Sequence, residues 1–238
     1  MKSRTKIVLK VSGTIAGDHS ESLNTSKINC LAQQIQQIKT AYQILLVVGG
    51  GNIIRGAQHA EKLGICASTA HQLGMLATCI NGTLITDLFV QAGLIATHLS
   101  ALICPDIADK AHYKNIQKAT DSDVIVVSGG TGLPFFSTDT AAIVRALEFG
   151  AQQVFKGTDV DGIYSDNPRT NPHAKLLTKT TFNTVITQSL QVMDKTAFVL
   201  AQQHKLTIKI FNIFTPHALV RVLNEPAFGS TITHEETI

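Results

Sequence analysis

Three successive glycines, Gly49 to Gly51, follow an apolar run at 44–48. An apolar run that breaks into glycines predicts a buried strand ending in a tight turn, where bare backbone N–H groups face outward. Such N–H groups bind anions, phosphate among them. Arg55 stands four residues further on, and its guanidinium group could hold two phosphate oxygens at once. The segment therefore predicts a phosphate-binding loop.

A second loop of the same kind spans 129–139, where glycines follow the apolar run 124–128 and Asp139 closes the segment. Neither loop has the Gly-x-Gly-x-x-Gly pattern of dinucleotide sites or the Gly-x4-Gly-Lys-Ser/Thr pattern of a P-loop. Glycines that merely make tight turns are the alternative for either loop taken alone. Two such loops, each with a charged residue at its far end, favour two phosphorylated ligands.

Composition limits the class of protein. The chain has 238 residues, 44% of them hydrophobic, which is enough for a full core, and we expect a single domain, 1–238. No apolar run reaches the roughly 18 residues of a membrane helix, and the N-terminal segment lacks the long apolar region of a signal peptide. The net charge of +3 decides little, because it suits phosphate ligands and ordinary solubility equally well. We expect a cytoplasmic protein with neither a membrane nor a nucleic acid as partner.

The cysteines are widely spaced and form no Cys-x-x-Cys pair, which favours buried, reduced thiols over disulfides or a zinc site. The cysteines are Cys30, Cys66, Cys79 and Cys104.

Short apolar runs alternate with helical patterns along the whole chain, which predicts a three-layer α/β/α sandwich around a mostly parallel sheet. Strands are predicted at 6–11, 44–48, 96–101, 124–128, 153–156 and 207–212, and helices at 25–41, 72–93, 138–149 and 195–204. The polar stretch 165–172 is predicted to be a surface loop. Ligands of such sheets gather at the carboxyl ends of the strands, where Lys10, both glycine loops and Lys156 fall.

Several longer motifs carry a resemblance that covers nearly the whole chain. They are Lys-Val-Ser-Gly at 10–13, Gly-Gly-Gly-Asn-Ile-Ile-Arg-Gly-Ala at 49–57, Leu-Gly-Met-Leu-Ala-Thr at 73–78, Gly-Thr-Gly-Leu-Pro-Phe-Phe-Ser-Thr-Asp-Thr-Ala-Ala at 130–142, Thr-Asp-Val-Asp-Gly-Ile-Tyr at 158–164, Val-Met-Asp at 192–194 and Phe-Asn at 211–212. With these motifs the chain resembles the bacterial uridylate kinases of the amino acid kinase superfamily. The glycine loops alone would equally suit acetylglutamate, carbamate or aspartate kinases, whereas the Pro-Phe-Phe-Ser-Thr-Asp run and Val-Met-Asp are typical of the UMP branch.

The resemblance implies transfer of a phosphoryl group from ATP to UMP, giving ADP and UDP, in pyrimidine nucleotide biosynthesis. It also implies Mg²⁺ bound with ATP, a homohexamer, an acceptor-binding N-terminal part and an ATP-binding C-terminal part. The implied catalytic residues are Lys10, Asp139, Asp194 and Lys156. The implied ATP-binding residues are Lys10, Val11, Ser12, Gly13, Gly51, Arg55, Thr158, Tyr164 and Asn167. The implied UMP-binding residues are Gly50, Arg55, His71, Thr131, Gly132, Leu133, Pro134, Phe135, Phe136, Ser137 and Thr138.

The acidic residues have a physical reason to be there. A lysine that crosses a phosphate-filled cleft must be aimed, and a carboxylate from Asp139 or Asp194 can aim it and keep it protonated. The same carboxylates could hold waters of the Mg²⁺ ion. Asp139 could instead only stabilise the first turn of a helix, and Lys156 could be an ordinary solvated lysine at a strand end.

The chain departs from the pattern of the uridylate kinases at three positions. His71 stands where these enzymes have the aspartate that holds the ribose hydroxyls, so an uncharged acceptor replaces a charged one. Thr14 replaces a glutamate, and the loop 15–24 lacks the usual Gly-Phe-Gly-Ile-Asp pattern, which argues against GTP activation. Asn167 replaces an aspartate. Two alternatives therefore stay open: a sibling kinase for another small acid, and a nucleotide-binding regulator without catalysis.

Overall fold

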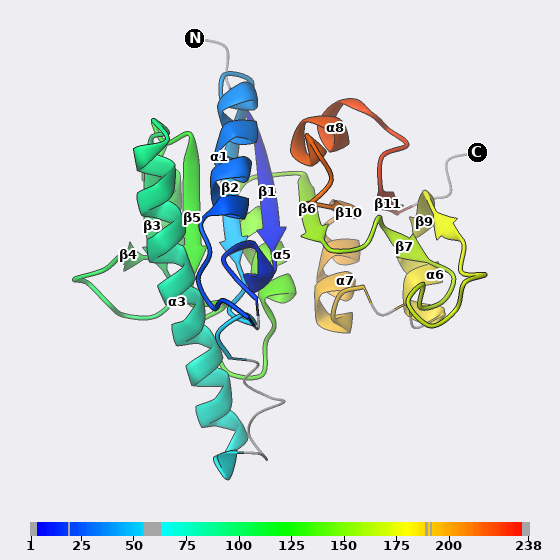
Figure 1. The fold of residues 1–238 in the computed structure, drawn as a ribbon, viewed down its shortest axis with the longest axis horizontal. Coiled ribbons are helices and arrows are strands. Elements are labelled where there is room, and N and C mark those ends of the chain that lie inside the picture. Colours follow the sequence, from blue (N-terminus) through cyan, green and yellow to red (C-terminus); the bar gives the residue numbers. More distant parts are fainter. Residues whose placement is uncertain (1–3, 19, 55–62, 189, 191, 235–238) are drawn as a thin grey trace.

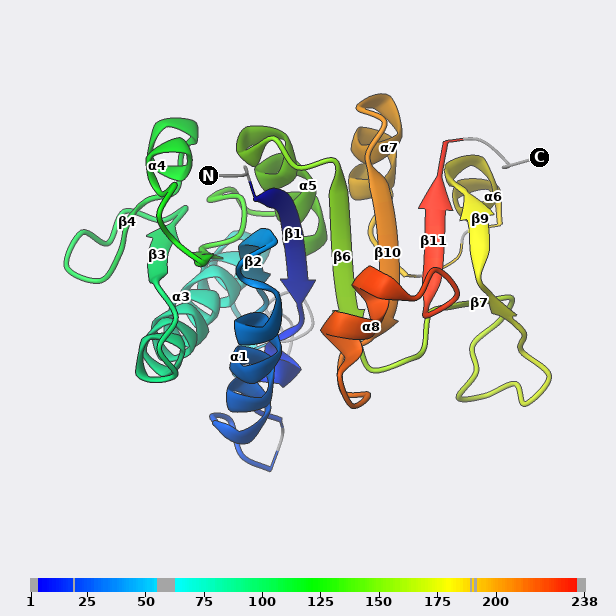
Figure 2. The same ribbon diagram turned by 90° about the horizontal axis from the view of Figure 1, so that it is seen from above.

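A mixed β-sheet forms the middle layer of the molecule (Figures 1 and 2). In the computed structural model, which describes residues 4–18, 20–54, 63–188, 190 and 192–234, the sheet has nine strands in the order β4-β3-β5-β2-β1-β6-β10-β11-β9. The strands are β1 (Thr5–Val11), β2 (Tyr42–Val48), β3 (Ala96–Ser100), β4 (Asp109–Lys110), β5 (Val124–Ser128), β6 (Gln153–Thr158), β9 (Lys179–Thr181), β10 (Thr207–Asn212) and β11 (Ser230–Thr233). All neighbouring pairs are parallel except β10 with β11. A separate antiparallel pair joins β7 (Ile163–Tyr164) to β8 (Leu176–Leu177).

Helices cover both faces of this sheet. One face carries α1 (Ser26–Ile38), α3 (Ala67–Gln91) and α8 (Ala218–Asn224), and the other carries α4 (Tyr113–Lys118), α5 (Thr138–Phe149), α6 (Phe182–Thr187) and α7 (Lys195–Gln203). Strand residues alternate between the two cores, because successive side chains leave opposite faces. Leu9 of β1 packs with the first group of helices, whereas its neighbour Val8 packs with the second. The predicted three-layer α/β/α architecture is thereby confirmed.

The predicted strands and helices are all present, with shifts at their ends. Helix α5 begins and ends as predicted, because both of its ends carry strong local signals. Ser137 caps the first turn by accepting hydrogen bonds from the backbone N–H groups of Asp139 and Thr140, and Gly150 ends the helix in the left-handed region at φ +80°. The segment 165–172 is an exposed loop, as predicted.

Helix α3 corrects the expectation that no segment is long and apolar enough to cross a membrane. It has 25 residues, and an 18-residue window within it reaches a mean hydropathy of 1.5, so it passes a test of length and composition. Scattered Thr, Gln and Asn side chains interrupt the apolar pattern, and this hid the length of the segment in the sequence. In the fold α3 lies on the sheet, with Ile85 and Phe89 fully buried.

The cysteines correct a second expectation. Cys79 is buried and Cys104 is half-buried, but Cys30 and Cys66 are exposed, and all four are free thiols. Cys30 lies on the solvent side of the amphipathic helix α1, and Cys66 is the N-cap residue of α3. The prediction of buried thiols therefore fails at two positions, because residue type is a weak guide to burial on a helix surface.

The strand order places the chemical motifs next to one another. The strands β5, β2, β1 and β6 are successive neighbours, and all four are parallel. Their carboxyl ends therefore share one edge of the sheet. The 129–138 loop, the Gly49–Gly51 loop, the Lys10–Gly13 segment and the end of β6 meet there.

Candidate functional site

Two lysines and an aspartate form a buried cluster at this edge, called here the lysine–aspartate cluster. Lys10 and Lys156 are register partners on β1 and β6, so their side chains leave the same face of the sheet side by side. Asp139 reaches them from the first turn of α5. Its Oδ1 atom lies 2.9 Å from Nζ of Lys10, and its Oδ2 atom lies 2.7 Å from Nζ of Lys156. The side chains are 9% (Lys10), 11% (Asp139) and 12% (Lys156) exposed, so solvent screens the contacts weakly.

Burial and charge set the protonation of this cluster. Burial alone would raise the pKa of Asp139, but the ammonium groups of Lys10 and Lys156 together hold it below its ordinary value of 3.8. Burial lowers the pKa of Lys156 below 10.5, against the attraction of Asp139 and with a further lowering by Lys10. With both lysines charged, the cluster carries two cations for one carboxylate. This excess positive charge suits an anionic ligand.

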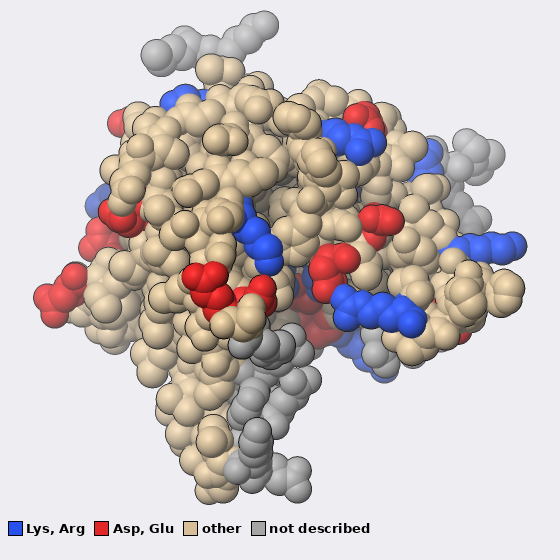
Figure 3. Space-filling view, in the orientation of Figure 1, with Lys and Arg blue, Asp and Glu red and all other residues tan. Residues whose placement is uncertain are grey.

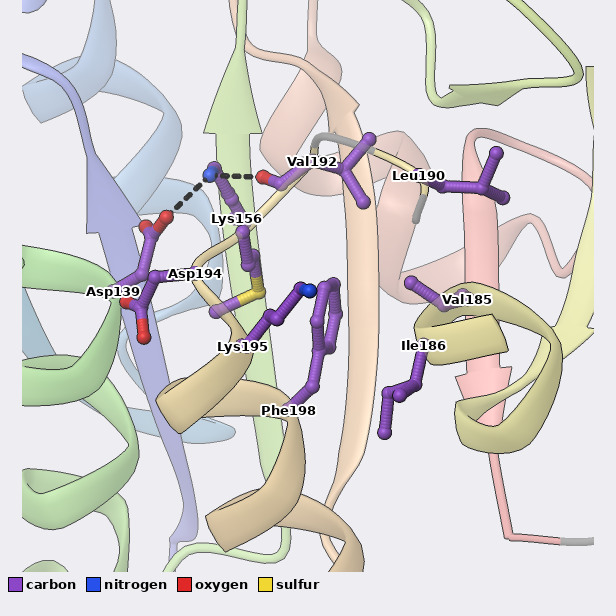
Figure 4. A pocket seen from close by; sticks show the side chains of 10 residues that line it. Asp139, Lys156, Val185, Ile186, Leu190, Val192, Asp194, Lys195 and Phe198 are labelled. Carbon is purple, nitrogen blue, oxygen red and sulfur yellow. Dashed lines mark hydrogen bonds and ion pairs between the residues drawn. The ribbon is translucent and has the colours of Figure 1, made fainter. Parts of the chain in front are cut away.

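Lys156 is thus no solvated lysine at a strand end, and that alternative is wrong. Its ammonium group also donates a hydrogen bond to the backbone carbonyl of Val192 (Figure 4). Asp139, by contrast, satisfies both of its interpretations. It stands in the first turn of α5, where its backbone N–H donates to Ser137, while its carboxylate bridges the two lysines.

Asp194 lies beside the cluster but has a different set of partners. It is the N-cap residue of α7, where its Oδ1 atom accepts a hydrogen bond from the backbone N–H of Ala197 at 2.9 Å. The hydroxyl of Thr140 donates to both carboxylate oxygens, at 2.9 and 3.0 Å, and that of Ser137 donates to Oδ2. Among the described residues no ion pair joins Asp194 to a lysine. Asp194 therefore ties the first turn of α7 to that of α5, and Asp139 is the carboxylate that pairs with the lysines.

The glycines of the first loop allow backbone segments to approach closely. A Cβ atom on Gly13 would lie 2.7 Å from the backbone nitrogen of Gly51, and one on Gly50 would lie 2.8 Å from the carbonyl oxygen of Gly74 in α3. Any larger side chain at either position would push these segments apart. The loops after β1 and β2 thus form one packed unit, held against α3.

A buried asparagine pair, which the sequence analysis does not predict, holds this unit against α3. Asn81 of α3 donates to the carbonyl oxygen of Gly49 at 2.7 Å and exchanges hydrogen bonds with Asn52 at 2.7 and 3.1 Å. Asn52 also donates to the carbonyl oxygen of Ser22 at 2.7 Å. Asn81 is completely buried. A polar residue amid the apolar residues of a long helix was the available signal, because such a residue needs a buried partner.

The second glycine loop, residues 129–138, is called here the acceptor loop. Gly129, Gly130 and Gly132 all have positive φ, between +58° and +80°. The backbone N–H of Gly129 donates to the hydroxyl of Thr78 on α3 at 2.6 Å, which fixes the start of the loop. Ser137 ends the loop as the N-cap of α5. Between these anchors Leu133, Phe135 and Phe136 are exposed.

His71 of α3 meets the acceptor loop at Phe135. The two ring centroids lie 4.8 Å apart with the ring planes inclined at 57°. Phe135 has φ +69°, a strained value for a bulky residue, and its side chain is largely exposed. The position that departs from the uridylate kinases thus faces the loop that is expected to bind UMP.

A cavity of about 640 Å³ adjoins the cluster at Lys156. Thr158, Tyr164 and Asn167 also line it. Burial raises the pKa of Tyr164, and the neighbouring Asp161 raises it further, so the phenol stays neutral. These residues come from β6, β7 and the exposed loop that follows, and the fold brings them to one hollow as the resemblance implies.

A smaller cavity of about 400 Å³ adjoins the cluster between α6 and α7 (Figure 4). Asp139, Lys156 and Asp194 line its polar side, and its opposite wall is apolar, with Val185 and Phe198. Lys156 therefore lines both cavities.

Other surfaces give less indication of a ligand. On the face seen in Figure 3, charged side chains of the described residues are scattered among uncharged ones, and no large area carries a single sign. No group of three His, Cys, Asp or Glu residues within the described part of the chain could hold a metal ion. Arg55 lies outside the described residues, so its predicted contacts with phosphate stay a prediction.

The family model of the amino acid kinase family matches residues 5–212. The chain belongs to the amino acid kinase family. Among curated relatives, the uridylate kinase of Colwellia psychrerythraea is 36% identical over 234 residues, covering 97% of this chain and 94% of the relative. The uridylate kinase of Mycoplasma pneumoniae is 37% identical over 228 residues, covering 93% of this chain and 96% of that protein.

Solved structures of this family agree with the fold. The crystal structure of UMP kinase from Ureaplasma parvum superposes with a TM-score of 0.91 at 36% identity, covering 97% of this chain and 99% of that one. UMP kinase from Bacillus anthracis gives a TM-score of 0.92 at 26% identity, with 99% and 98% covered. The predicted resemblance to the uridylate kinases is thus confirmed over nearly the full length of both partners.

In this amino acid kinase family member, the fold gathers the predicted site residues into three neighbouring groups. Lys10, Asp139 and Lys156 touch directly, the acceptor loop meets His71, and the cavity beyond Lys156 takes Thr158, Tyr164 and Asn167. The supporting side chains of Thr78, Asn81, Asn52 and Thr140 were not singled out from the sequence.

Proposed function

We propose that the chain transfers the γ-phosphoryl group of ATP to UMP, giving ADP and UDP. The lysine–aspartate cluster carries this proposal. It lies at the edge where both glycine loops begin, and its Lys156 lines a cavity large enough for a nucleoside. The uridylate kinases to which the chain is similar over nearly its full length support the same reaction.

The chemistry requires alignment and charge neutralisation more than proton transfer. A phosphomonoester has a second pKa of about 6, so the attacking oxygen of UMP is largely ionised at neutral pH and no general base is needed. The transferred group then passes in line between two anions. We assign Lys10 to this group, with Asp139 holding the lysine in position and Lys156 supplying a second positive charge.

The two nucleotides are assigned to opposite sides of the cluster. ATP is assigned the phosphate contacts of Val11, Ser12, Gly13 and Gly51, and the cavity of Thr158, Tyr164 and Asn167 for its base and ribose. UMP is assigned Gly50, His71 and, within the acceptor loop, the residues from Thr131 to Thr138. The UMP-binding residues then lie in the N-terminal part of the chain, and those for the base and ribose of ATP lie in the C-terminal part.

The residues present fit a Mg²⁺ ion that arrives with ATP. Both oxygens of Asp139 already face lysines, and Asp194 already accepts from Ser137, Thr140 and Ala197, so either carboxylate would reach the ion through water. The bound ion supplies further positive charge to the phosphate oxygens.

Assembly and cellular role extend the same proposal. Three large apolar side chains of α3, Leu76, Ile80 and Val90, are 52%, 49% and 53% exposed, which supports association of the chain into the expected homohexamer. The reaction would make UDP for pyrimidine nucleotide biosynthesis in the cytoplasm.

An ADP-release assay with UMP, CMP, acetylglutamate and carbamate as acceptors tests this function. We expect turnover with UMP and ATP, and little with the other three acceptors. Preference for acetylglutamate or carbamate would identify a sibling kinase instead. ATP binding without turnover of any acceptor would identify a regulator, although the intact lysine–aspartate cluster argues against it.

Changing His71 to aspartate should tighten UMP binding. A charged acceptor forms stronger hydrogen bonds with ribose hydroxyls than a neutral imidazole does, so we expect KM for UMP to fall by about fivefold. KM for deoxy-UMP, which lacks one hydroxyl, should change less in the same comparison. Equal shifts for both nucleotides would mean that position 71 does not contact the ribose.

A further inference from the structure

A second polar cluster lies beneath the acceptor loop, between the sheet and α3. The Nε2 atom of His98 on β3 is 2.9 Å from the hydroxyl of Ser128, the last residue of β5. That hydroxyl also donates to the thiol of Cys79 on α3, with Oγ and Sγ 3.5 Å apart. Ser128 is completely buried and His98 is half-buried. The phosphoryl-transfer mechanism uses none of these side chains.

A glycine in α3 provides the space for the His98 ring. A Cβ atom on Gly82 would lie 2.6 Å from Nε2 of His98 and 3.0 Å from Cβ of Ser128. Neither distance leaves room for a methyl group. The ring therefore sits in a notch of the helix surface that only glycine can leave open, although glycine lowers the stability of a helix interior.

Ser128 connects this notch to the acceptor loop, because the loop begins at the next residue. Its carbonyl oxygen accepts from the backbone N–H of Ala101 at 2.9 Å, and the N–H of Gly129 donates to Thr78 at 2.6 Å. Gly129 has φ +75°, and a Cβ atom there would lie 2.8 Å from the backbone nitrogen of Leu102. The start of the loop is packed closely against its neighbours, and the Ser128 side chain lies directly beside it.

We propose that neutral His98, seated in the Gly82 notch, is a positioning residue that holds the acceptor loop in its UMP-binding conformation. The proposal rests on the assignment of that loop to UMP. Protonation would place a charge on a half-buried ring, and hydration of that charge would favour a ring that has left its seat and released Ser128. The loop would then lose its fixed starting point, and UMP would bind more weakly while ATP binding stayed the same.

The electrostatic surroundings of His98 give the direction of this effect. Burial lowers the pKa of His98 below 6.5 and is the only cause of the shift. Among the described residues, the ring has its hydrogen bond with Ser128 of β5, which in turn donates to the thiol of Cys79 on α3. The folded arrangement favours the neutral ring. The support that His98 gives to the acceptor loop is therefore complete above pH 6.5 and is lost as the pH falls through the lowered pKa of His98.

Steady-state kinetics between pH 5 and pH 8 test the proposal with His98→Gln and Gly82→Ala. In the unaltered protein, KM for UMP should rise toward acid by about fivefold more than in His98→Gln, the low end of typical coupling between sites. Glutamine cannot titrate here, so the difference between the two profiles reports the contribution of His98. Gly82→Ala should expel the ring and raise KM for UMP at every pH. In both variants KM for ATP should equal that of the unaltered protein at every pH. The control His204→Gln, at an exposed position, should match the unaltered protein in every kinetic parameter.

A binding readout separates positioning from a structural role. If neutral His98 favours UMP, then UMP must in turn lower the pKa of His98, because coupling between two sites is reciprocal. Histidine NMR titrations with and without UMP, assigned by difference from His98→Gln, measure this shift. An unchanged pKa, or equal pH profiles in the unaltered protein and His98→Gln, would overturn the proposal. Absence of both binding and turnover of UMP would instead overturn the proposed function and this proposal with it.

Discussion

Lys10→Met is expected to lower kcat by about 10² to 10³, the loss seen when one preorganised charge contact to a transition state is removed. Lys10 is buried, paired with Asp139 and set at the carboxyl end of β1, where the phosphoryl group is proposed to pass. Methionine keeps the length and apolar stem of lysine and removes the charge. Because the acceptor loop is untouched, KM for UMP should change little.

Lys6→Met provides a matched control for this change. Lys6 stands on the same strand and the same face of the sheet, but its ammonium group donates to the carbonyl oxygen of Phe149 at 3.0 Å, at the opposite edge. The kcat of Lys6→Met should stay at the level of the unaltered protein. Of the two variants, only Lys10→Met should show a lower single-turnover rate. A Lys10 variant as fast as its parent would remove Lys10 from the mechanism.

The strength of local signals decided how much of the fold could be predicted. Central strands such as β2 are continuous apolar runs, and α5 has both a serine cap and a terminal glycine, so these elements stand out in the sequence. The sequence predicts no element after Asn212. Helix α8 follows His217, which lies in the left-handed region and makes no side-chain cap, and the helix is short. Strand β11 shows no long apolar run. Their positions depend on packing against β10.

The candidate site shows the same division. Family motifs indicated Lys10, Asp139 and Lys156 separately, but their contacts depend on the register between β1 and β6 and on where α5 begins. No local pattern carries that information, and the partner of Lys156 was therefore not predicted. The Asn52–Asn81 pair and the seat of His98 depend on α3 crossing the ends of several strands. Such contacts join distant segments and leave only a buried polar residue or an unexplained glycine as a trace.

Asp139→Asn should reduce the free energy of unfolding at pH 7 by about 3 to 5 kcal/mol, the cost of removing one partner from a buried ion pair. The amide keeps the shape of the carboxylate but removes from two largely buried ammonium groups the carboxylate that pairs with both. The pKa of Lys156, which burial already lowers, should then fall further, because the attraction of Asp139 raised it. Urea unfolding from pH 7 to pH 9.5 measures both effects.

The dependence of the free energy of unfolding on pH distinguishes the loss of the counter-charge from a packing defect. A lysine with a lowered pKa in the folded state releases its proton before the unfolded chain does, so stability rises with pH up to the ordinary value of 10.5. We expect a steeper rise in Asp139→Asn than in the unaltered protein.

Asp123→Asn is the matched control, because Asp123 also pairs with two cations, Arg4 at 3.1 Å and Lys39 at 3.2 Å, whose side chains are 22% and 28% exposed. Water can solvate those cations, so this control should lose less stability and show no steeper rise. Parallel pH profiles for Asp139→Asn and the unaltered protein would mean that the two lysines do not depend on Asp139 for their charge.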